Sequence, residues 1–144
     1  MSIKSVLCAV DISHEDDVQV LETGDKLARL DGAQLDVITV VPNYGVTLVN
    51  SYFDENFQGE LVTKTKSALN DMVTRVLGDE RNQSIRHIVA AGSIYEEILE
   101  AAKQAGTDLI VIGAHKPHLK EFLLGPNAAR VARHSQCSVY IVRE

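Results

Sequence analysis

The chain has 144 residues, of which 45% are hydrophobic and 24% are charged. A domain of this length buries a substantial core, and these proportions exclude an intrinsically disordered chain. Fourteen basic residues against 20 acidic ones give a net charge of −6, which argues against general binding to nucleic acid or an anionic membrane. We expect one domain over residues 1–144, and a small anionic ligand remains compatible with this charge.

The amino-terminal segment and the cysteines bear on cellular location. The start of the chain is apolar only from Val6 to Val10, which is too short for the core of a signal peptide. No apolar run approaches the roughly 20 residues of a membrane-spanning helix. Cys8 and Cys137 do not have the spacing of a redox pair or a zinc motif, and we expect no disulfide between them. These features predict a cytoplasmic protein without direct membrane insertion.

Five short runs rich in Val and Ile predict β-strands. Several are nearly continuous rather than alternating, which is typical of strands buried on both faces of a parallel sheet. The five runs are Ile3–Val10, Leu35–Val41, Ile85–Ala91, Asp108–Ile112 and Ser138–Val142.

Amphipathic stretches follow the first two strands. Glu15–Leu30 and Glu60–Leu77 carry apolar residues at helical spacing, and each predicts a helix. Asp16 and Asp17 lie at the start of the first of these helices, where acidic side chains interact favourably with the helix dipole. We expect both carboxylates to be solvated rather than to act as a catalytic pair.

Capping signals mark the other two helices. Ser93 and Glu96 have the spacing of a capping box at the start of the third helix, and Gly106 is expected to end it. The last helix is expected over about 126–134, because Pro126 is tolerated in a first helical turn.

The elements alternate between strand and helix along the whole chain. This alternation predicts an α/β fold, a single Rossmann-like domain with helices on both faces of a five-stranded parallel sheet. We expect the strand order 3-2-1-4-5, with a topological switch point between the first and fourth strands.

One connection is unusually long. Residues 42–59 contain four of the seven aromatic residues of the chain, and loops of this length are often functional. These rings either anchor the loop to its own domain or belong to a lid or partner-binding segment. The four are Tyr44, Tyr52, Phe53 and Phe57.

Ligands of such sheets bind beyond the carboxyl ends of the strands at the switch point. The first strand ends at Ala9-Val10-Asp11, and the fourth ends at Ile112-Gly113. Asp11 has the chemistry to accept hydrogen bonds from ribose hydroxyls or to hold a metal through water. The sequence therefore places a candidate ligand site between these two strand ends.

The segment after the fourth strand suits a phosphate group. Gly113 and Gly125 allow close approach of the backbone to a ligand. The amides and the dipole at the start of the last helix favour an anion, and Lys116 adds a point charge. Residues 113–134 hold four basic residues against one acidic residue, a local net charge of +3.

The segment from Gly113 to Arg143 resembles the carboxy-terminal signature of the universal stress protein family. Its pattern of His-x-Pro, Leu-Leu-Gly-x-Asn-Ala-Ala, Arg-His and Cys-Ser-Val is most similar to the F/G-type, nucleotide-binding branch. Residues 6–11 and 92–98 also match, so that the resemblance covers the whole chain.

The resemblance implies an adenine nucleotide alpha hydrolase-like domain that binds ATP, ADP or AMP, with or without Mg²⁺. It implies that Asp11 contacts the ribose, that Val40 packs on the adenine, and that residues 125–127 hold the phosphates. The nucleotide-binding residues so expected are Ala9, Val10, Asp11, Val40, Ile112, Gly113, His115, Lys116, Gly125, Pro126 and Asn127.

The chain departs from the family's nucleotide motif in three respects. Lys116 stands in place of the middle glycine, and the spacer that follows is one residue shorter. Pro126 stands in place of the usual serine, so that a hydroxyl and a backbone amide are lost from the phosphate site. We expect Asn127 and Lys116 to carry more of the phosphate binding, with lower affinity or a preference for AMP or ADP.

Two histidines in the same loop admit two interpretations. His115 and His118 have a spacing that would hold a metal on a helix, but Pro117 between them disfavours a helix. A position near the phosphates is the better interpretation of both, and we expect no metal site built by the chain itself. The sequence also lacks a nucleophile elbow and a P-loop, so efficient catalysis is not expected.

Three functional hypotheses follow from these features. The first is a cytoplasmic ATP-binding regulator of the stress response that works as a homodimer. The second is a slow ATPase that uses the same site, and the third is a nucleotide-free interaction protein that regulates a partner such as a transporter. The apolar last strand would form the dimer through its edge, with the residues Val139, Tyr140, Ile141 and Val142.

Overall fold

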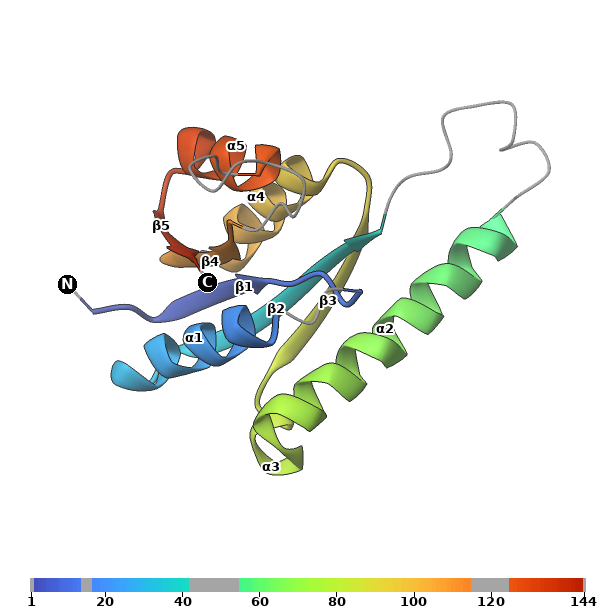
Figure 1. Ribbon diagram of the computed structural model, residues 1–144, viewed down its shortest axis with the longest axis horizontal. Coiled ribbons are helices and arrows are strands. Elements are labelled where there is room, and N and C mark those ends of the chain that lie inside the picture. The colour runs from blue at the N-terminus through green and yellow to red at the C-terminus, as the bar shows by residue number, and fades with distance from the viewer. Residues whose placement is uncertain (1, 14–16, 42–54, 115–124, 144) are drawn as a thin grey trace.

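The computed structural model describes residues 2–13, 17–41, 55–114 and 125–143, and the side chains of residues 55–58 lie outside this description. Strands and helices alternate along the chain (Figure 1). Each strand overlaps its predicted run, with ends that differ by at most two residues. The strands are β1 (Ser5–Ala9), β2 (Gln34–Val41), β3 (Arg86–Ala91), β4 (Leu109–Gly113) and β5 (Ser138–Val142). The helices are α1 (Asp17–Leu30), α2 (Glu55–Leu77), α3 (Asp79–Asn82), α4 (Ile94–Ala105) and α5 (Pro126–His134).

The strands form one parallel sheet in the order β3-β2-β1-β4-β5, which confirms the predicted topology. β1 is the central strand, and Cys8 pairs with Val37 on one side and with Val111 on the other. Because neighbours flank β1 on both sides and helices cover both faces, its residues from Val6 to Val10 are all buried. This burial explains the continuous apolar sequence of the strand.

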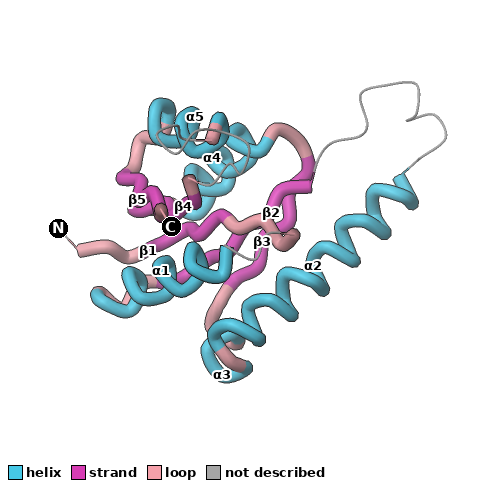
Figure 2. Tube along the Cα trace, viewed as in Figure 1, coloured by secondary structure: helices cyan, strands magenta, loops and turns pink. Residues whose placement is uncertain are grey.

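Helices cover both faces of the sheet, as predicted (Figure 2). Val6, Cys8 and Val10 point to the face covered by α1 and α2. Leu7 and Ala9 point to the opposite face, which α4 and α5 cover. The alternation of side chains along one strand therefore divides the core into two layers. In the described ranges, no helix combines the length and the apolar character that a membrane crossing needs.

The boundary between the long connection and α2 was predicted five residues too late. α2 begins at Glu55, so the last part of the connection expected over 42–59 is helical. Gly59 caused the error, because a glycine is unfavourable in a helix interior and reads as a loop residue. In the structure Gly59 is exposed and helical, and the hydroxyl of Thr63 donates to its carbonyl oxygen at 2.9 Å. The aromatic residues Tyr44, Tyr52 and Phe53 lie outside the described residues.

The short helix α3 was not predicted. Its four residues are polar, so they carry no apolar periodicity, and it follows Gly78 at a φ of 92°. Asn82 ends α3 and donates to Asn70 and Thr74 of α2 at 2.9 Å and 2.8 Å. Its amide oxygen contacts the ring of His87 on β3 at 2.6 Å. Burial, and next to it the charge of Lys66, lowers the pKa of His87, so the neutral ring is favoured in this contact.

Ser93 is the N-cap of α4 and Gly106 is its left-handed C-cap, as predicted, but the capping box does not form. The Ser93 side chain makes no capping hydrogen bond. The side chain of Glu96 instead accepts a hydrogen bond from the hydroxyl of Tyr95 at 3.1 Å. A competing partner for the glutamate therefore replaces the reciprocal pair that the spacing predicts.

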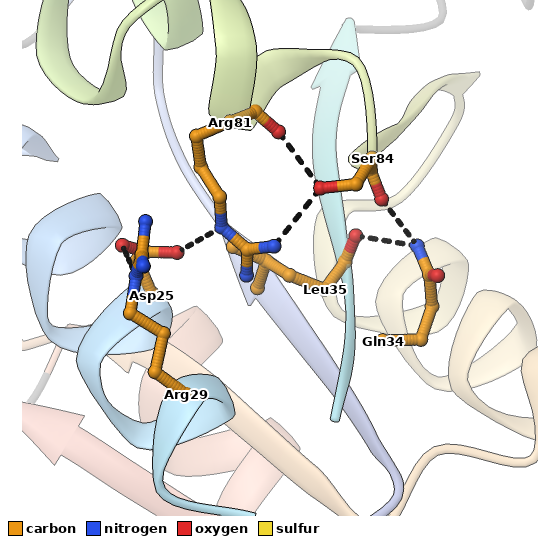
Figure 3. Close-up of polar contacts among 6 residues, drawn as sticks. All are labelled: Asp25, Arg29, Gln34, Leu35, Arg81 and Ser84. Atoms are coloured by element: carbon orange, nitrogen blue, oxygen red, sulfur yellow. Dashed lines mark hydrogen bonds and ion pairs between the residues drawn. The ribbon is translucent and has the colours of Figure 1, made fainter. Parts of the chain in front are cut away.

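A polar network joins α1, α3 and β2 at the amino-terminal edge of the sheet (Figure 3). Asp25 of α1 accepts hydrogen bonds from Arg81 at 2.6 Å and from Arg29 at 2.8 Å. Arg81 also donates to the hydroxyl of Ser84 at 2.9 Å, and the Gln34 side chain donates to the Ser84 carbonyl at 3.1 Å. The network ties the connection between α2 and β3 to the rest of the domain.

A second ion pair crosses between β2 and β3. Asp36 is 0% exposed, and Arg86 stands directly opposite it in the strand register. The guanidinium donates to both carboxylate oxygens, at 3.0 Å and 3.1 Å. The Arg86 side chain is 58% exposed, so the pair joins a fully buried carboxylate to a guanidinium that reaches solvent. The Gln34 side chain also donates to Asp36 at 3.3 Å, but Arg86 supplies the charge that offsets the desolvation of the carboxylate.

We predict that Arg86→Ala lowers the free energy of unfolding by about 3 kcal/mol, because it leaves Asp36 buried without its charge partner. Replacing both residues by valine should cost less than Arg86→Ala alone, since no buried charge remains. Arg29→Ala is the control and should cost less than about 1 kcal/mol, because Asp25 keeps its second partner, Arg81. Urea denaturation of the four proteins measures these differences, and equal losses for Arg29→Ala and Arg86→Ala would contradict the prediction.

Candidate functional site

β1 pairs with β4 along its length, up to its last residue. Ala9 pairs with Ile112 across the two strands. Beyond this pair, the amide of Val10 donates to Ile38 of β2 at 2.9 Å, whereas the amide of Ala114 donates to Val142 of β5 at 3.0 Å. The two neighbouring strands therefore turn to opposite partners. A crevice between such strands is where ligands of parallel sheets bind.

Small and aliphatic residues lie near these strand ends on one face of the sheet. Ala9 and Ile112 belong to the core layer under α4 and α5, together with Ala128 from the first turn of α5. Val40, which extends β2 beyond the end of β1, is half-buried and packs against the same layer. The start of α5 therefore packs on this face of the sheet. Val10 belongs to the opposite layer, under α1.

Asp11 is the second residue after the end of β1 and is exposed. Its Oδ1 atom accepts hydrogen bonds from the backbone amide of Ser13 at 2.9 Å and from the Ser13 hydroxyl at 2.6 Å. Its own backbone amide donates to Oδ2 of Asp17. The carboxylate is thus oriented by its neighbours at the edge of the crevice.

The start of α5 forms the other side of the site. Gly125 is the buried N-cap, Pro126 is the exposed first residue, and Asn127 is half-buried. The amide of Ala129 donates a hydrogen bond to the Gly125 carbonyl at 3.0 Å, and Pro126 has no amide hydrogen. The amides of Asn127 and Ala128 belong to the first helical turn, where no carbonyl of the same helix receives them.

The predicted site residues from both ends of the crevice therefore lie at one edge of the sheet. Those within the described ranges are Ala9, Val10, Asp11, Val40, Ile112, Gly113, Gly125, Pro126 and Asn127. His115 and Lys116 lie outside the described residues, as does His118. Within the described ranges, no group of three or more His, Cys, Asp or Glu side chains is arranged to hold a metal.

Comparison with known proteins identifies the family. The sequence model of the universal stress protein family matches residues 2–143. The chain belongs to the universal stress protein family. Universal stress protein G of Shigella flexneri is 29% identical over 135 residues, which cover 88% of this chain and 94% of the relative.

Solved structures show the same fold. The protein MJ0577 of Methanocaldococcus jannaschii superposes with a TM-score of 0.81 at 23% identity, covering 100% of this chain and 98% of that one. A universal stress protein described in complex with cAMP superposes with a TM-score of 0.69 at 18% identity, covering 99% and 98%. At these identities the likeness establishes the universal stress protein fold.

The structure corrects the prediction that was made for Asp17. It was expected to be solvated at the start of α1, but it is only 2% exposed. Its carboxylate points back under the loop that follows β1, where it receives the Asp11 amide. An acidic residue in a first helical turn has the same sequence pattern whether its side chain faces solvent or the protein, so the pattern could not reveal this burial.

Close packing of α1 on β1 brings Asp17 to this position. Gly24 of α1 lies over Cys8, whose thiol donates to the Val20 carbonyl at 3.4 Å. A Cβ atom at Gly24 would lie 3.0 Å from the Cys8 sulfur. Burial, then the charges of Asp17 and Asp25, raises the pKa of the Cys8 thiol. Cys8 is therefore a neutral core residue under the site rather than a reactive one.

Two glycine substitutions should have opposite effects on stability. Gly24→Ala forces the new methyl group into Cys8 and should cost about 1–3 kcal/mol of unfolding free energy. Gly59→Ala meets no atom within 4 Å and should add about 0.5–1 kcal/mol, because alanine is the better helix former. Combining Gly24→Ala with Cys8→Ala should cost less than the sum of the two single substitutions. Thermal and urea unfolding measure these effects, and a stabilising Gly24→Ala would contradict the packing argument.

Proposed function

We propose that this universal stress protein is a cytoplasmic regulator that binds an adenine nucleotide and works as a homodimer. The sheet order β3-β2-β1-β4-β5 is the observation that carries the proposal, because it puts the ends of β1 and β4, at the Ala9–Ile112 pair, at a topological switch point, where ligands of parallel sheets bind. Asp11 would accept hydrogen bonds from the ribose hydroxyls. Val40 and Ile112 would pack against the adenine, and a relative described in complex with cAMP supports an adenine nucleotide as the class of ligand.

The phosphates would lie at the start of α5. The amides of Asn127 and Ala128, the Asn127 side chain and the positive end of the helix dipole suit an anion there. Lys116 would add positive charge from the preceding loop. Pro126 contributes neither an amide nor a hydroxyl, so we propose weaker phosphate binding than a serine would give, and AMP or ADP as competitive ligands. Mg²⁺, where present with ATP, would be held by the phosphates and water rather than by a cluster of side chains.

Nucleotide occupancy would act as a signal only if the nucleotide binds two states of the protein with different affinities. A partner-bound and a free state would provide such a pair. The proposal therefore assigns the protein a regulatory role, with binding rather than turnover as its activity.

The nucleotide proposal predicts that millimolar ATP, ADP or AMP raises the melting temperature of the purified protein, since a ligand that binds only the folded state stabilises it. Asp11→Ala should weaken ATP binding by about tenfold or more, because it removes hydrogen bonds to a charged acceptor. Pro126→Ser should strengthen ATP binding by restoring an amide and a hydroxyl. Isothermal titration calorimetry measures the affinities, with Asp31→Ala at the opposite edge of the sheet as the control. The proposal is wrong if none of the three nucleotides shifts the melting temperature.

The homodimer would form through β5. Within the described sheet, β5 pairs only with β4, so its outer edge presents backbone hydrogen-bonding groups. Tyr140 on this strand is 46% exposed, although it is a large aromatic residue. Antiparallel pairing of two β5 edges would satisfy the backbone groups and cover the tyrosine.

We predict that the protein sediments as a dimer at micromolar concentration and that Tyr140→Glu shifts it to a monomer. The two-fold axis of an antiparallel pair would bring the two introduced carboxylates near each other, and like charges across a strand pair are destabilising. Leu30→Glu is the control, because Leu30 is 73% exposed but lies on α1 rather than on the strand edge. Sedimentation velocity measures both variants, and a monomeric wild-type protein would refute the dimer.

A further inference from the structure

The backbone amide of Asp11 donates its hydrogen bond to a side chain rather than to a neighbouring strand. The preceding residue, Val10, still donates to Ile38 of β2, so it continues the ladder of β1 by one residue. The amide of Asp11 instead donates to Oδ2 of Asp17, which reaches it from the first turn of α1. This contact is therefore the first one that directs the chain away from the sheet and toward the crevice.

We infer that Asp17 is a positioning residue for ribose recognition, an inference that rests on the proposed nucleotide function. Asp17 holds the backbone of Asp11, while Ser13 holds the Asp11 side chain through two hydrogen bonds to Oδ1. The two residues together fix where the Asp11 carboxylate lies relative to the end of β1. Asp17 itself is 2% exposed and acts through Asp11 rather than by touching the nucleotide.

The acceptor atom of Asp17, rather than its charge, carries this role. A negative charge buried beside Asp11 opposes the binding of a phosphate-bearing ligand, so the charge offers no advantage for that ligand. The hydrogen bond to Asp11 requires only an oxygen at the Oδ2 position, which an asparagine also supplies. Asp17→Asn should therefore preserve the positioning, and Asp17→Ala should abolish it.

The test compares ATP with 2′,3′-dideoxy-ATP, which lacks both ribose hydroxyls, by isothermal titration calorimetry. The wild-type protein should bind ATP about tenfold or more tightly than the dideoxy analogue, because the analogue leaves Asp11 without its hydroxyl partners. Asp17→Ala should reduce this preference to within about twofold, whereas Asp17→Asn should keep it. Asp31→Ala is the matched control, since Asp31 also accepts a backbone amide, that of Ile3 at 2.8 Å, but at the opposite edge of the sheet.

A second measurement follows the Asp11 amide directly. Hydrogen exchange measured by nuclear magnetic resonance should show this amide protected in the wild-type protein and in Asp17→Asn, and exchanging at least about tenfold faster in Asp17→Ala. If Asp17→Ala only lowered the overall stability, amide exchange would accelerate across the whole domain rather than first at Asp11. We expect that general pattern for Asp31→Ala, compared at similar stability.

The outcomes separate this inference from the proposed function. If the wild-type protein does not bind ATP, the proposed function fails and the inference fails with it. If the protein binds ATP but Asp17→Ala keeps the preference for ribose hydroxyls, only the inference is overturned. Loss of the preference in Asp17→Asn as well, or an unchanged exchange rate of the Asp11 amide in Asp17→Ala, would also overturn it.

Discussion

The order of the strands, with β1 and β4 side by side at the topological switch point, is the constraint on which the rest of the site depends. Here the chain after β1 continues toward β2, and the chain after β4 continues toward β5. The loop that carries Asp11 and the start of α5, which follows its N-cap Gly125, consequently lie at the same edge of the sheet. The sheet order alone brings together segments more than 110 residues apart.

Most of the fold could be predicted because the strands carry a strong signal. β1 is buried on both faces and paired on both edges, so its apolar run is continuous and its ends are easily placed. α3 gave no such signal, because its four polar residues bury no side chain. The start of α2 was obscured by Gly59, because a glycine is unfavourable in a helix interior although the rest of a long helix can accommodate one. Helix and strand propensity and apolar periodicity thus predict the elements that contribute to the core more accurately than elements such as α3, which bury no side chain.

The candidate site shows a different limit. Asp11 could be located because the end of a strand at a switch point is defined by the topology. The burial of Asp17 depends on how closely α1 approaches β1, and that distance is set by the absence of a side chain at Gly24 above Cys8. The sequence shows that a glycine is present at position 24, but not which strand this glycine lies over. Contacts of this kind between a helix and a strand are visible only in the folded structure.

The pair between Asp36 and Arg86 has a consequence for the folding of the sheet. β3 is an edge strand, and its residues are only partly buried, so apolar burial alone penalises a misaligned pairing with β2 only weakly. A slip of one residue would turn Arg86 to the other face and leave Asp36 enclosed without a counter-charge. The ion pair thus discriminates against incorrect strand alignments, and its contribution is to the uniqueness of the folded state as well as to its free energy.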